Sequence, residues 1–330
     1  MPFLSLLSNP AANMGLGGYT ELAYPKFLEY QAIGAGATGP SSAPGGGGGA
    51  GGFAQGTMSW TDTLSNNTQT WTVVVAPTTV PTTVNVSGAN STIKGANMSL
   101  VTAYGGGRGA RSTTTTVTSG AAGGSGGGGC STYSGSGTYA NPGNNTGTRT
   151  GIVGGTGSQG KPGGTSPIGN GGGGGGYNVY YSGVTSNSEG NMGTRDWSNA
   201  YVCFGGGGIG RTTGLSNRFT YYYWNGSNDP FNTQVMTTYL PSSFHTDQYD
   251  GGDATGGGGQ STKGTGTTVT YIGKGGSGKV LIRYLSSAKP LKVLSGPAPT
   301  KIYTFDDYLK RTYQTYLFTT PGTTVFTFAP

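Results

Sequence analysis

Runs of consecutive glycines constrain the fold of this chain more than any other feature. They occupy residues 45–49, 126–129, 171–176, 205–208 and 256–259. Few stretches long enough for a helix lack glycine, and a glycine inside a helix costs roughly 1 kcal/mol relative to alanine. Thr, Val, Tyr and Phe, which favour strands, fill the spaces between the runs. The sequence therefore predicts an all-β fold.

Disorder is the first alternative, because the chain holds 69 Gly and 17 Pro among 330 residues. That proportion reaches the range of low-complexity chains. Disordered chains, however, are poor in aromatic residues and rich in charge. This chain has 21 Tyr, 11 Phe and 4 Trp, and only 9% of its residues are charged. We therefore expect a folded chain in which glycine has a structural role.

The glycine runs themselves have two interpretations. They are either flexible linkers or packed extended helices with three residues per turn, whose missing side chains let neighbouring backbones touch. Such helices make no internal hydrogen bonds, so buried runs must bond to one another. Several runs spread along one chain favour packing, since linkers would be few and would separate obvious domains. We expect a glycine-rich sheet framework with packed polyglycine helices and long loops.

Strand-like segments lie between the runs, at residues 27–33, 69–75, 82–86, 99–104, 113–117, 219–224 and 280–284. Prolines at 290, 297 and 299 then mark a linker. Beyond it, residues 313–320 and 324–328 are joined by Pro321-Gly322, which predicts a hairpin. We divide the chain into an N-terminal arm or attachment segment (1–25), a glycine-rich β domain (26–285) and a Pro-linked basic C-terminal hairpin module (286–330).

The two ends of the glycine-rich domain are predicted to meet. Residues 27–33 and 280–284 are both strand-like, and each adjoins a glycine-rich stretch. Pairing them in one sheet would close a single unit, and long insertions between them would cost little loop entropy. In this layout the insertions project from one end, and residues 1–25 and 285–330 emerge at the other end for attachment.

The net charge of +7 originates in the C-terminal part of the chain. Residues 1–262 hold nine Lys or Arg and nine Asp or Glu, whereas residues 263–330 hold nine Lys or Arg against Asp306 and Asp307. A basic region can meet nucleic acid or an anionic surface; it can also contact an acidic partner protein or remain a solvated surface. The sequence has no tight basic run and no recognition helix, which disfavours nucleic acid.

Two patterns approach known catalytic or nucleotide-binding motifs. Residues 273–279 follow phosphate-loop spacing, but Val280 stands where Ser or Thr would hold magnesium, and a strand rather than a helix is predicted to follow. His245 is the only histidine; Ser242, Ser243 and Asp247 lie nearby, but adjacency in a loop is not triad geometry. We expect no enzymatic activity and no bound nucleotide or other cofactor.

Three aspartates could bind a metal ion, and the two cysteines could form a disulfide. Asp247, Asp250 and Asp253 place three carboxylates within seven residues. They could bind calcium, although their spacing matches no EF-hand loop and a solvated polar turn explains them as well; we predict no metal site. Cys130 and Cys203 could pair, but two cysteines do not make a disulfide scaffold.

Aromatic residues gather in the insertions. Tyr and Trp offer large contact areas at little entropic cost, which suits binding loops and sugar stacking. They could equally cap a core to which glycine contributes no hydrophobic area. The candidate binding residues are Tyr177, Tyr180, Tyr181, Trp197, Tyr221, Tyr222, Tyr223 and Trp224.

Three stretches resemble a known family. Leu28-Glu-Tyr-Gln-Ala-Ile-Gly-Ala-Gly36, followed by Gly45-Gly-Gly-Gly-Gly-Ala-Gly-Gly-Phe53, resembles the opening of the glycine-rich domain of tail-fibre and other virion proteins of marine bacteriophages. Gly275-Gly-Ser-Gly-Lys-Val-Leu-Ile-Arg-Tyr284 resembles its close. Tyr316-Leu-Phe-Thr-Thr-Pro-Gly-Thr-Thr-Val-Phe-Thr-Phe328 resembles a strand pair that often precedes such a domain, here out of its usual order.

The resemblance implies a structural virion protein, a tail fibre or other exposed appendage with a host-binding role. Its implied partners are other virion proteins, copies of itself, and a host surface glycan or outer-membrane protein. The family implies no known ligand and no catalytic residue. The alternatives are a purely architectural virion component such as a decoration or connector protein, a surface glycan depolymerase, and a non-viral extracellular matrix protein.

Overall fold

The computed structural model describes residues 24–25, 27–41, 45–59, 70–82, 85–95, 99–112, 117–118, 120–131, 138–139, 159–160, 163, 174–176, 193–199, 201–203, 220–223, 234–237, 250–259, 261–263, 269–306 and 309–328. Every regular element within these residues is a strand, which confirms the all-β prediction. None of the described residues forms a helix that is long and apolar enough to cross a membrane.

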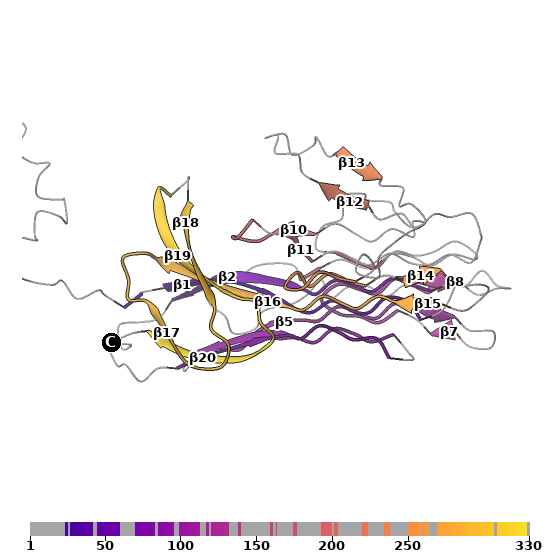
Figure 1. Ribbon diagram of the computed structural model, residues 1–330, viewed down its shortest axis with the longest axis horizontal. Coiled ribbons are helices and arrows are strands. Elements are labelled where there is room, and N and C mark those ends of the chain that lie inside the picture. The colour runs from indigo at the N-terminus through magenta and orange to yellow at the C-terminus, as the bar shows by residue number, and fades with distance from the viewer. Residues whose placement is uncertain are drawn as a thin grey trace, which may run out of the picture.

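Two antiparallel five-stranded sheets lie at one end of the molecule (Figure 1). The first sheet has the order β18-β19-β16-β1-β2 and the second has the order β17-β20-β3-β4-β5. The strands are β1 (Phe27–Ile33), β2 (Phe53–Ser59), β3 (Trp71–Val75), β4 (Ser91–Gly95), β5 (Val101–Ala103), β16 (Lys279–Leu285), β17 (Leu291–Ser295), β18 (Thr300–Asp306), β19 (Arg311–Phe318) and β20 (Gly322–Phe328).

Five short hairpins complete the set of described strands. β6 (Arg111–Ser112) pairs with β7 (Val117–Thr118), β8 (Cys130–Ser131) with β9 (Thr138–Tyr139), β10 (Thr194–Arg195) with β11 (Tyr201–Val202), β12 (Thr220–Tyr223) with β13 (Gln234–Thr237), and β14 (Ser261–Lys263) with β15 (Val269–Ile272). The labelled strands β7, β8, β14 and β15 lie at the end of the molecule opposite the C-terminus (Figure 1).

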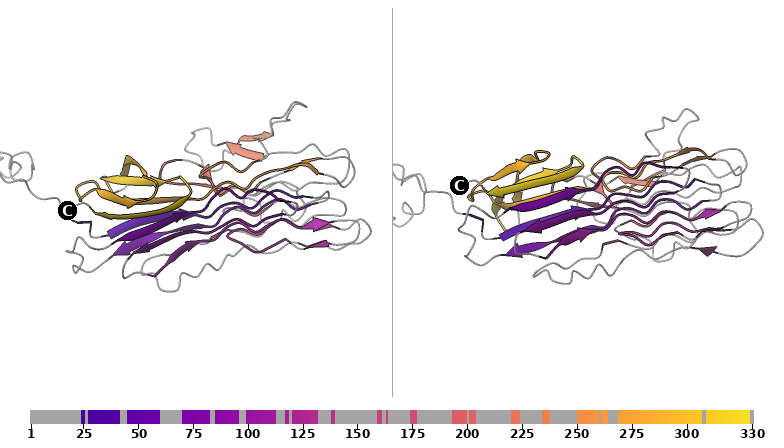
Figure 2. Two further views of the ribbon diagram at one scale, coloured as in Figure 1. Left: turned by 60° about the horizontal axis from the view of Figure 1, so that its bottom comes forward. Right: turned by 90° about the horizontal axis from the view of Figure 1, so that it is seen from below.

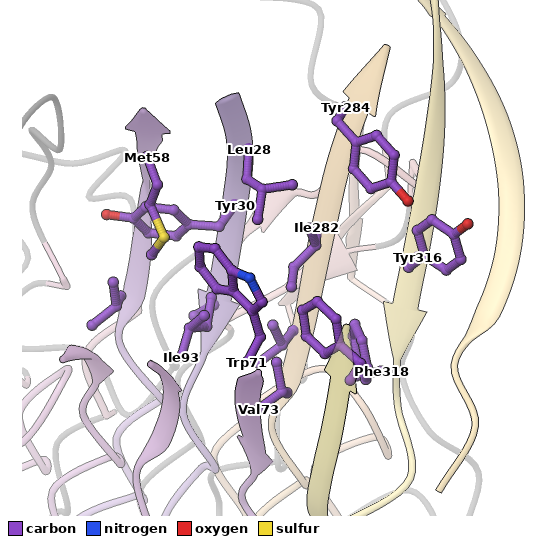
Figure 3. Packing of buried hydrophobic residues seen from close by; sticks show 14 of the residues in the cluster. Leu28, Tyr30, Met58, Trp71, Val73, Ile93, Ile282, Tyr284, Tyr316 and Phe318 are labelled. Carbon is purple, nitrogen blue, oxygen red and sulfur yellow. The ribbon is translucent and has the colours of Figure 1, made fainter. Parts of the chain in front are cut away.

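The hydrophobic core lies between the two sheets. Strands bury alternate residues, and in β3 these are Trp71, Val73 and Val75. The Trp71 ring stacks on Phe326 of β20, with centroids 6.2 Å apart. Figure 3 shows side chains from β1, β2, β16 and β19 meeting those from β3 and β4 in one cluster. Because glycine contributes no side chain elsewhere, this cluster is the main apolar core of the described residues.

The predicted meeting of the two ends of the glycine-rich domain is confirmed. β1 pairs antiparallel with β16, with Tyr30 opposite Ile282. Side chains alternate along both strands, so the residues facing the core on one lie beside those on the other. The described start of the chain and the C-terminus lie together at the sheet end of the molecule (Figure 1).

The predicted C-terminal hairpin is wrong. β19 pairs with β16 and β18 in the first sheet, whereas β20 pairs with β17 and β3 in the second. The turn around Pro321 therefore carries the chain from one sheet to the other. β19 and β20 each pair with two strands of their own sheet rather than with each other. Their side chains Phe318 and Phe326 meet across the core, with ring centroids 5.9 Å apart. Residues 291–328 thus supply two strands to each sheet.

The strand predicted at residues 82–86 is also wrong for its described residues, 82, 85 and 86, none of which lies in a strand. The backbone at Val86 belongs instead to the glycine-rich packing, since its carbonyl accepts the amide of Thr38 at 3.0 Å.

After β1, the backbone amides of residues 34–39 donate in turn to three neighbouring segments, so that every third amide donates to the same segment. The amides of residues 34–39 reach carbonyls on three other segments, with N···O distances of 2.8–3.0 Å. Each segment receives one bond per three residues, and it runs antiparallel because its acceptors descend in number. Gly34 and Ala37 donate to Gly52 and Gly49, Ala35 and Thr38 to Ala89 and Val86, and Gly36 and Gly39 to Gly276 and Gly273.

The same period appears in the glycine run at residues 45–49. Gly46, Gly49 and Gly52 donate to Ala110, Gly107 and Tyr104 at 2.7–2.9 Å. Figure 2 shows these segments running side by side from the sheets towards the short hairpins. The buried backbone groups are therefore satisfied between segments, as buried amides and carbonyls must be.

At many glycines of these segments, the neighbouring backbone leaves no room for a side chain. A Cβ atom added at Gly36 would lie 1.9 Å from the carbonyl oxygen of Gly257, and one at Gly106 would lie 1.9 Å from that of Gly49. In the run at residues 171–176, Gly174 is equally close to Gly48, and Gly175 donates to Gly126 at 2.8 Å. Residues 171–173 and 205–208 lie outside the described residues. Close backbone contact explains why this sequence needs glycine at the positions described.

Candidate functional site

The outer face of the first sheet carries a group of charged and aromatic side chains that contact one another. Along β16, Val280, Ile282 and Tyr284 face the core. The alternate residues Lys279 and Arg283 therefore point to the opposite face. There they meet the β10–β11 hairpin, which lies over this sheet.

Lys279 forms a buried ion pair with Asp196. Its Nζ lies 2.5 Å from the Asp196 Oδ2, and the two side chains are 5% and 0% exposed. The Ser198 hydroxyl joins them: it accepts from Lys279 Nζ at 3.0 Å and donates to Asp196 Oδ1 at 2.5 Å. These bonds offset the cost of removing two charges from water. Lys279 thus takes part in an ion pair, and it is the first residue of β16, which contains the strand predicted at residues 280–284.

A second, smaller apolar core lies on the outer face of the sheet, where Lys279 is buried. Its residues come from β1, β2, β11 and β16 and from the chain next to β2 and β11. Its buried members are Ile33, Ala50, Phe53, Val202, Cys203 and Leu281, with Trp197 and Leu317 packed against them.

Arg283 lies between two aromatic rings and two carboxylates. Its guanidinium carbon is 4.2 Å from the centroid of Trp197 and 4.5 Å from that of Tyr313. Its Nε is 2.5 Å from Glu29 Oε2, and its Nη2 is 3.7 Å from Asp306 Oδ2. Burial, together with the negative charge of Glu29, raises the pKa of Tyr313. The planar guanidinium suits this combination of stacking and ion pairing.

The β10–β11 turn is shaped to place Trp197 over this face. The backbone amide of Trp197 donates to Gln31 Oε1 at 3.0 Å, and Asn199 has a φ of 65°. Arg195 Nη1 donates to Asn199 Oδ1 at 2.6 Å across the turn. Of the predicted binding aromatics, Trp197 thus packs on the sheet, which favours the interpretation that it caps a core.

The other candidate aromatics are not brought together by the described structure. Tyr221, Tyr222 and Tyr223 lie in β12, paired with β13, but their side chains are outside the described part of the structure. Tyr177, Tyr180, Tyr181 and Trp224 lie wholly outside it. Their role in binding stays a prediction.

Replacing Trp197 by alanine is expected to lower the free energy of unfolding by about 1–2 kcal/mol, because a partly desolvated cation–π contact with Arg283 is lost. Urea denaturation measures the loss. Tyr104→Ala, at an exposed aromatic side chain, is the control and should stay within about 0.5 kcal/mol of the parent. If Trp197→Ala is as stable as the parent, its ring is not held on the sheet and the binding-loop interpretation regains support.

Two of the three carboxylates that were considered as calcium ligands have protein partners. Asp250 accepts the backbone amide of Lys274 at 2.7 Å and lies 3.9 Å from its ammonium. Asp253 accepts the Thr78 hydroxyl at 3.0 Å. Asp247 lies outside the described residues, as do His245, Ser242 and Ser243. Within the described ranges, no three His, Cys, Asp or Glu side chains gather as metal ligands would.

Cys203 carries a free, buried thiol with a φ of 62°. Burial, followed by the charge of Asp196, raises its pKa well above the usual range. The neutral thiol therefore acts as a small apolar group in the outer core. The side chain of Cys130 lies outside the described residues.

The sequence reasoning missed the Lys279–Asp196 pair and the stacking of Arg283. One local signal was available: in Lys-Val-Leu-Ile-Arg-Tyr, the charged residues share a face with Leu281. An apolar residue between two charges on one face indicates that this face is covered. Nothing in the sequence identifies the cover as residues 194–203, which lie more than 75 residues earlier in the chain.

One of three comparisons with known proteins identifies a family. No curated protein and no solved structure matched the chain. Residues 17–285, which include both glycine segments with the three-residue bonding period, match the family described as "Glycine-rich domain". Since the match covers well over half of the sequence, the chain belongs to the glycine-rich domain family.

Proposed function

We propose that this chain is a structural protein of a bacteriophage virion, a tail fibre or other exposed appendage that presents host-binding loops and has no enzymatic activity. The observation that carries the proposal is the sideways bonding of the glycine segments, which join the sheet end to the hairpin end. Such a body suits a rigid spacer. Family membership and the resemblance of residues 28–36, 45–53 and 275–284 to virion domains support the same assignment.

The glycine segments are, in this proposal, polyglycine helices with three residues per turn. A bonding period of three, with successive amides directed to three different neighbours, is what such a helix requires. A Cβ atom added at several of these glycines would lie 1.9 Å from a carbonyl oxygen of a neighbouring segment. The backbones are therefore packed so closely that only glycine fits at these positions. A body of this kind transmits force along its length, because its segments are bonded to neighbours on several sides.

The two ends then have different tasks. The sheet end holds the apolar core and both described chain ends, and it attaches to the particle. The opposite end holds short hairpins. The proposal assigns contact with a host surface to that end, since binding residues concentrate on connections held by a rigid scaffold. The proposed ligand class is a host glycan or outer-membrane protein.

A purely architectural role is the second candidate. It is favoured by the packing of Trp197 against Arg283, which covers part of one candidate aromatic side chain. A decoration or connector protein would have no need of exposed binding aromatics.

Antibodies raised separately against the hairpin end and the sheet end test the proposal. We expect the hairpin-end antibody to label appendages of particles carrying this chain in electron micrographs and to block their adsorption to host cells. Labelling without blocking assigns the architectural role. Absence of the chain from purified particles overturns the virion assignment, and release of sugars from host glycan by the purified protein overturns the non-enzymatic one.

A further inference from the structure

The edge of the first sheet at β18 is open. Among the described strands, only β19 pairs with β18. Alternate backbone N–H and C=O groups of an edge strand point away from its partner and can pair with another chain. The β18 sequence, Thr-Lys-Ile-Tyr-Thr-Phe-Asp, is rich in strand-forming residues and has a single lysine as protection.

One face of β18 continues the core-facing side of the first sheet, but its side chains are exposed. Lys301 pairs with Tyr316, a core residue, so Lys301, Tyr303 and Phe305 share the face that is buried one strand further in. Tyr303 is nevertheless 65% exposed and Phe305 58% exposed. Adjacent exposed aromatic side chains beside an unpaired strand edge are features of an interaction site.

The exposed charges at this edge are mostly positive. Lys301 lies on β18, and Lys310 and Arg311 lie where the turn leads into β19. Asp306, the acidic residue described on these strands, already lies 3.7 Å from Arg283. The ammonium of Lys301 lies 5.0 Å from the Tyr303 ring centroid, within the aromatic face itself. Two copies of such an edge would repel each other, which disfavours a second copy of this chain as the occupant.

We propose that β18 is the docking strand for an extended, acidic segment of a partner protein. The segment pairs with the free edge of β18 as an additional strand of the first sheet, its carboxylates beside Lys301 and its apolar side chains on Tyr303 and Phe305. Backbone bonds provide the affinity of this mode, and alternate side chains provide its specificity. The positive edge selects a negatively charged partner.

This inference rests on the proposed function only in taking the partner to be another component of the same particle. The docking surface is tested on the isolated full chain, so its result is separate from the antibody experiment on particles.

The probe is a fluorescein-labelled peptide of about ten residues in which Glu-Glu alternates with Val-Val, a length sufficient for one strand. Because side chains alternate along a strand, each face of this peptide then carries both Glu and Val. A second peptide carries Lys in place of each Glu. We expect saturable binding of the acidic peptide by fluorescence anisotropy and none of the basic one. Lys301→Glu, and separately Tyr303→Glu with Phe305→Glu, should each weaken binding at least tenfold.

Two control variants match these changes elsewhere on the surface. Lys94→Glu reverses an exposed lysine on β4, and Leu100→Glu places a carboxylate at a side chain that is 52% exposed near β5. Both should bind the acidic peptide as the parent does. Thermal melts establish whether each variant is folded. If the variant with Tyr303→Glu and Phe305→Glu does not fold, the peptide affinity of Lys301→Glu alone decides the test.

Three results would overturn the proposal. One is no binding of the acidic peptide at millimolar concentration. Another is equal weakening by Lys94→Glu and Lys301→Glu, which would show that only net charge matters. The third is a dimer of the parent in sedimentation that Tyr303→Glu with Phe305→Glu dissociates, which would make a second copy the occupant.

Discussion

Replacing Gly51 by alanine is expected to lower the free energy of unfolding by about 3 kcal/mol, the upper end of the usual cost of overpacking. The new Cβ would lie 1.9 Å from the carbonyl oxygen of Gly34 and 2.3 Å from its carbonyl carbon. Backbone cannot rotate aside as a side chain can. The amide of Gly51 is also bonded to Gly256 at 2.8 Å, so a shift that relieves one contact breaks another. Thermal and urea denaturation measure the effect.

Gly252→Ala is the matched control for this prediction. Gly252 is exposed, and a Cβ there meets first the methyl group of Thr255, at 3.2 Å, which can move. Its stability should stay within about 0.5 kcal/mol of the parent. If Gly51→Ala and the parent unfold at the same temperature, the glycine runs behave as flexible linkers and the packed arrangement is contradicted.

Replacing Asp196 by asparagine is expected to destabilise the protein by about 3–5 kcal/mol, because it leaves the buried ammonium of Lys279 without a compensating charge. Asparagine keeps the shape of the side chain and an oxygen for the Ser198 hydroxyl, so the loss reports the charge rather than a cavity. Denaturant titration with intrinsic fluorescence follows both unfolding and the release of Trp197 from the sheet.

The double variant Asp196→Asn with Lys279→Met should recover much of this loss, since neither charge then remains in the outer core. Lys274→Met is the control, because Lys274 is exposed and lies 3.9 Å from Asp250. An exposed pair of this kind is worth at most about 1 kcal/mol. A single Asp196→Asn variant as stable as Lys274→Met would mean that water reaches the Lys279 site.

Local sequence was sufficient for those elements whose neighbours on the chain define them. Residues 27–33 and 280–284 alternate core-facing and outer-facing side chains, and each adjoins a glycine-rich stretch, so both strands were predictable. Their pairing was predicted because joining the two ends closes the glycine-rich domain into a single unit. The crossing between sheets at Pro321 was not predictable in the same way, because the turn residues permit either a hairpin or such a crossing.

The candidate site depended on contacts that no local pattern encodes. Trp197 was identified as a residue suited to contact, but its partner Arg283 lies 86 residues further along the chain. Tyr313, which also contacts Arg283, lies 116 residues beyond Trp197. Whether an aromatic residue in an insertion binds a ligand or covers a sheet depends on which sheet the insertion reaches. That is a property of the assembled fold.

The sequence alone determined that this protein is all-β and that its glycines have a structural role, because glycine penalises helices and the intervening residues favour strands at every local window. Tertiary structure alone decided which backbones touch, which sheet each C-terminal strand joins and which charges are buried. These outcomes depend on hydrogen bonds and packing between segments far apart in the chain, whose free energies exist only once the segments meet.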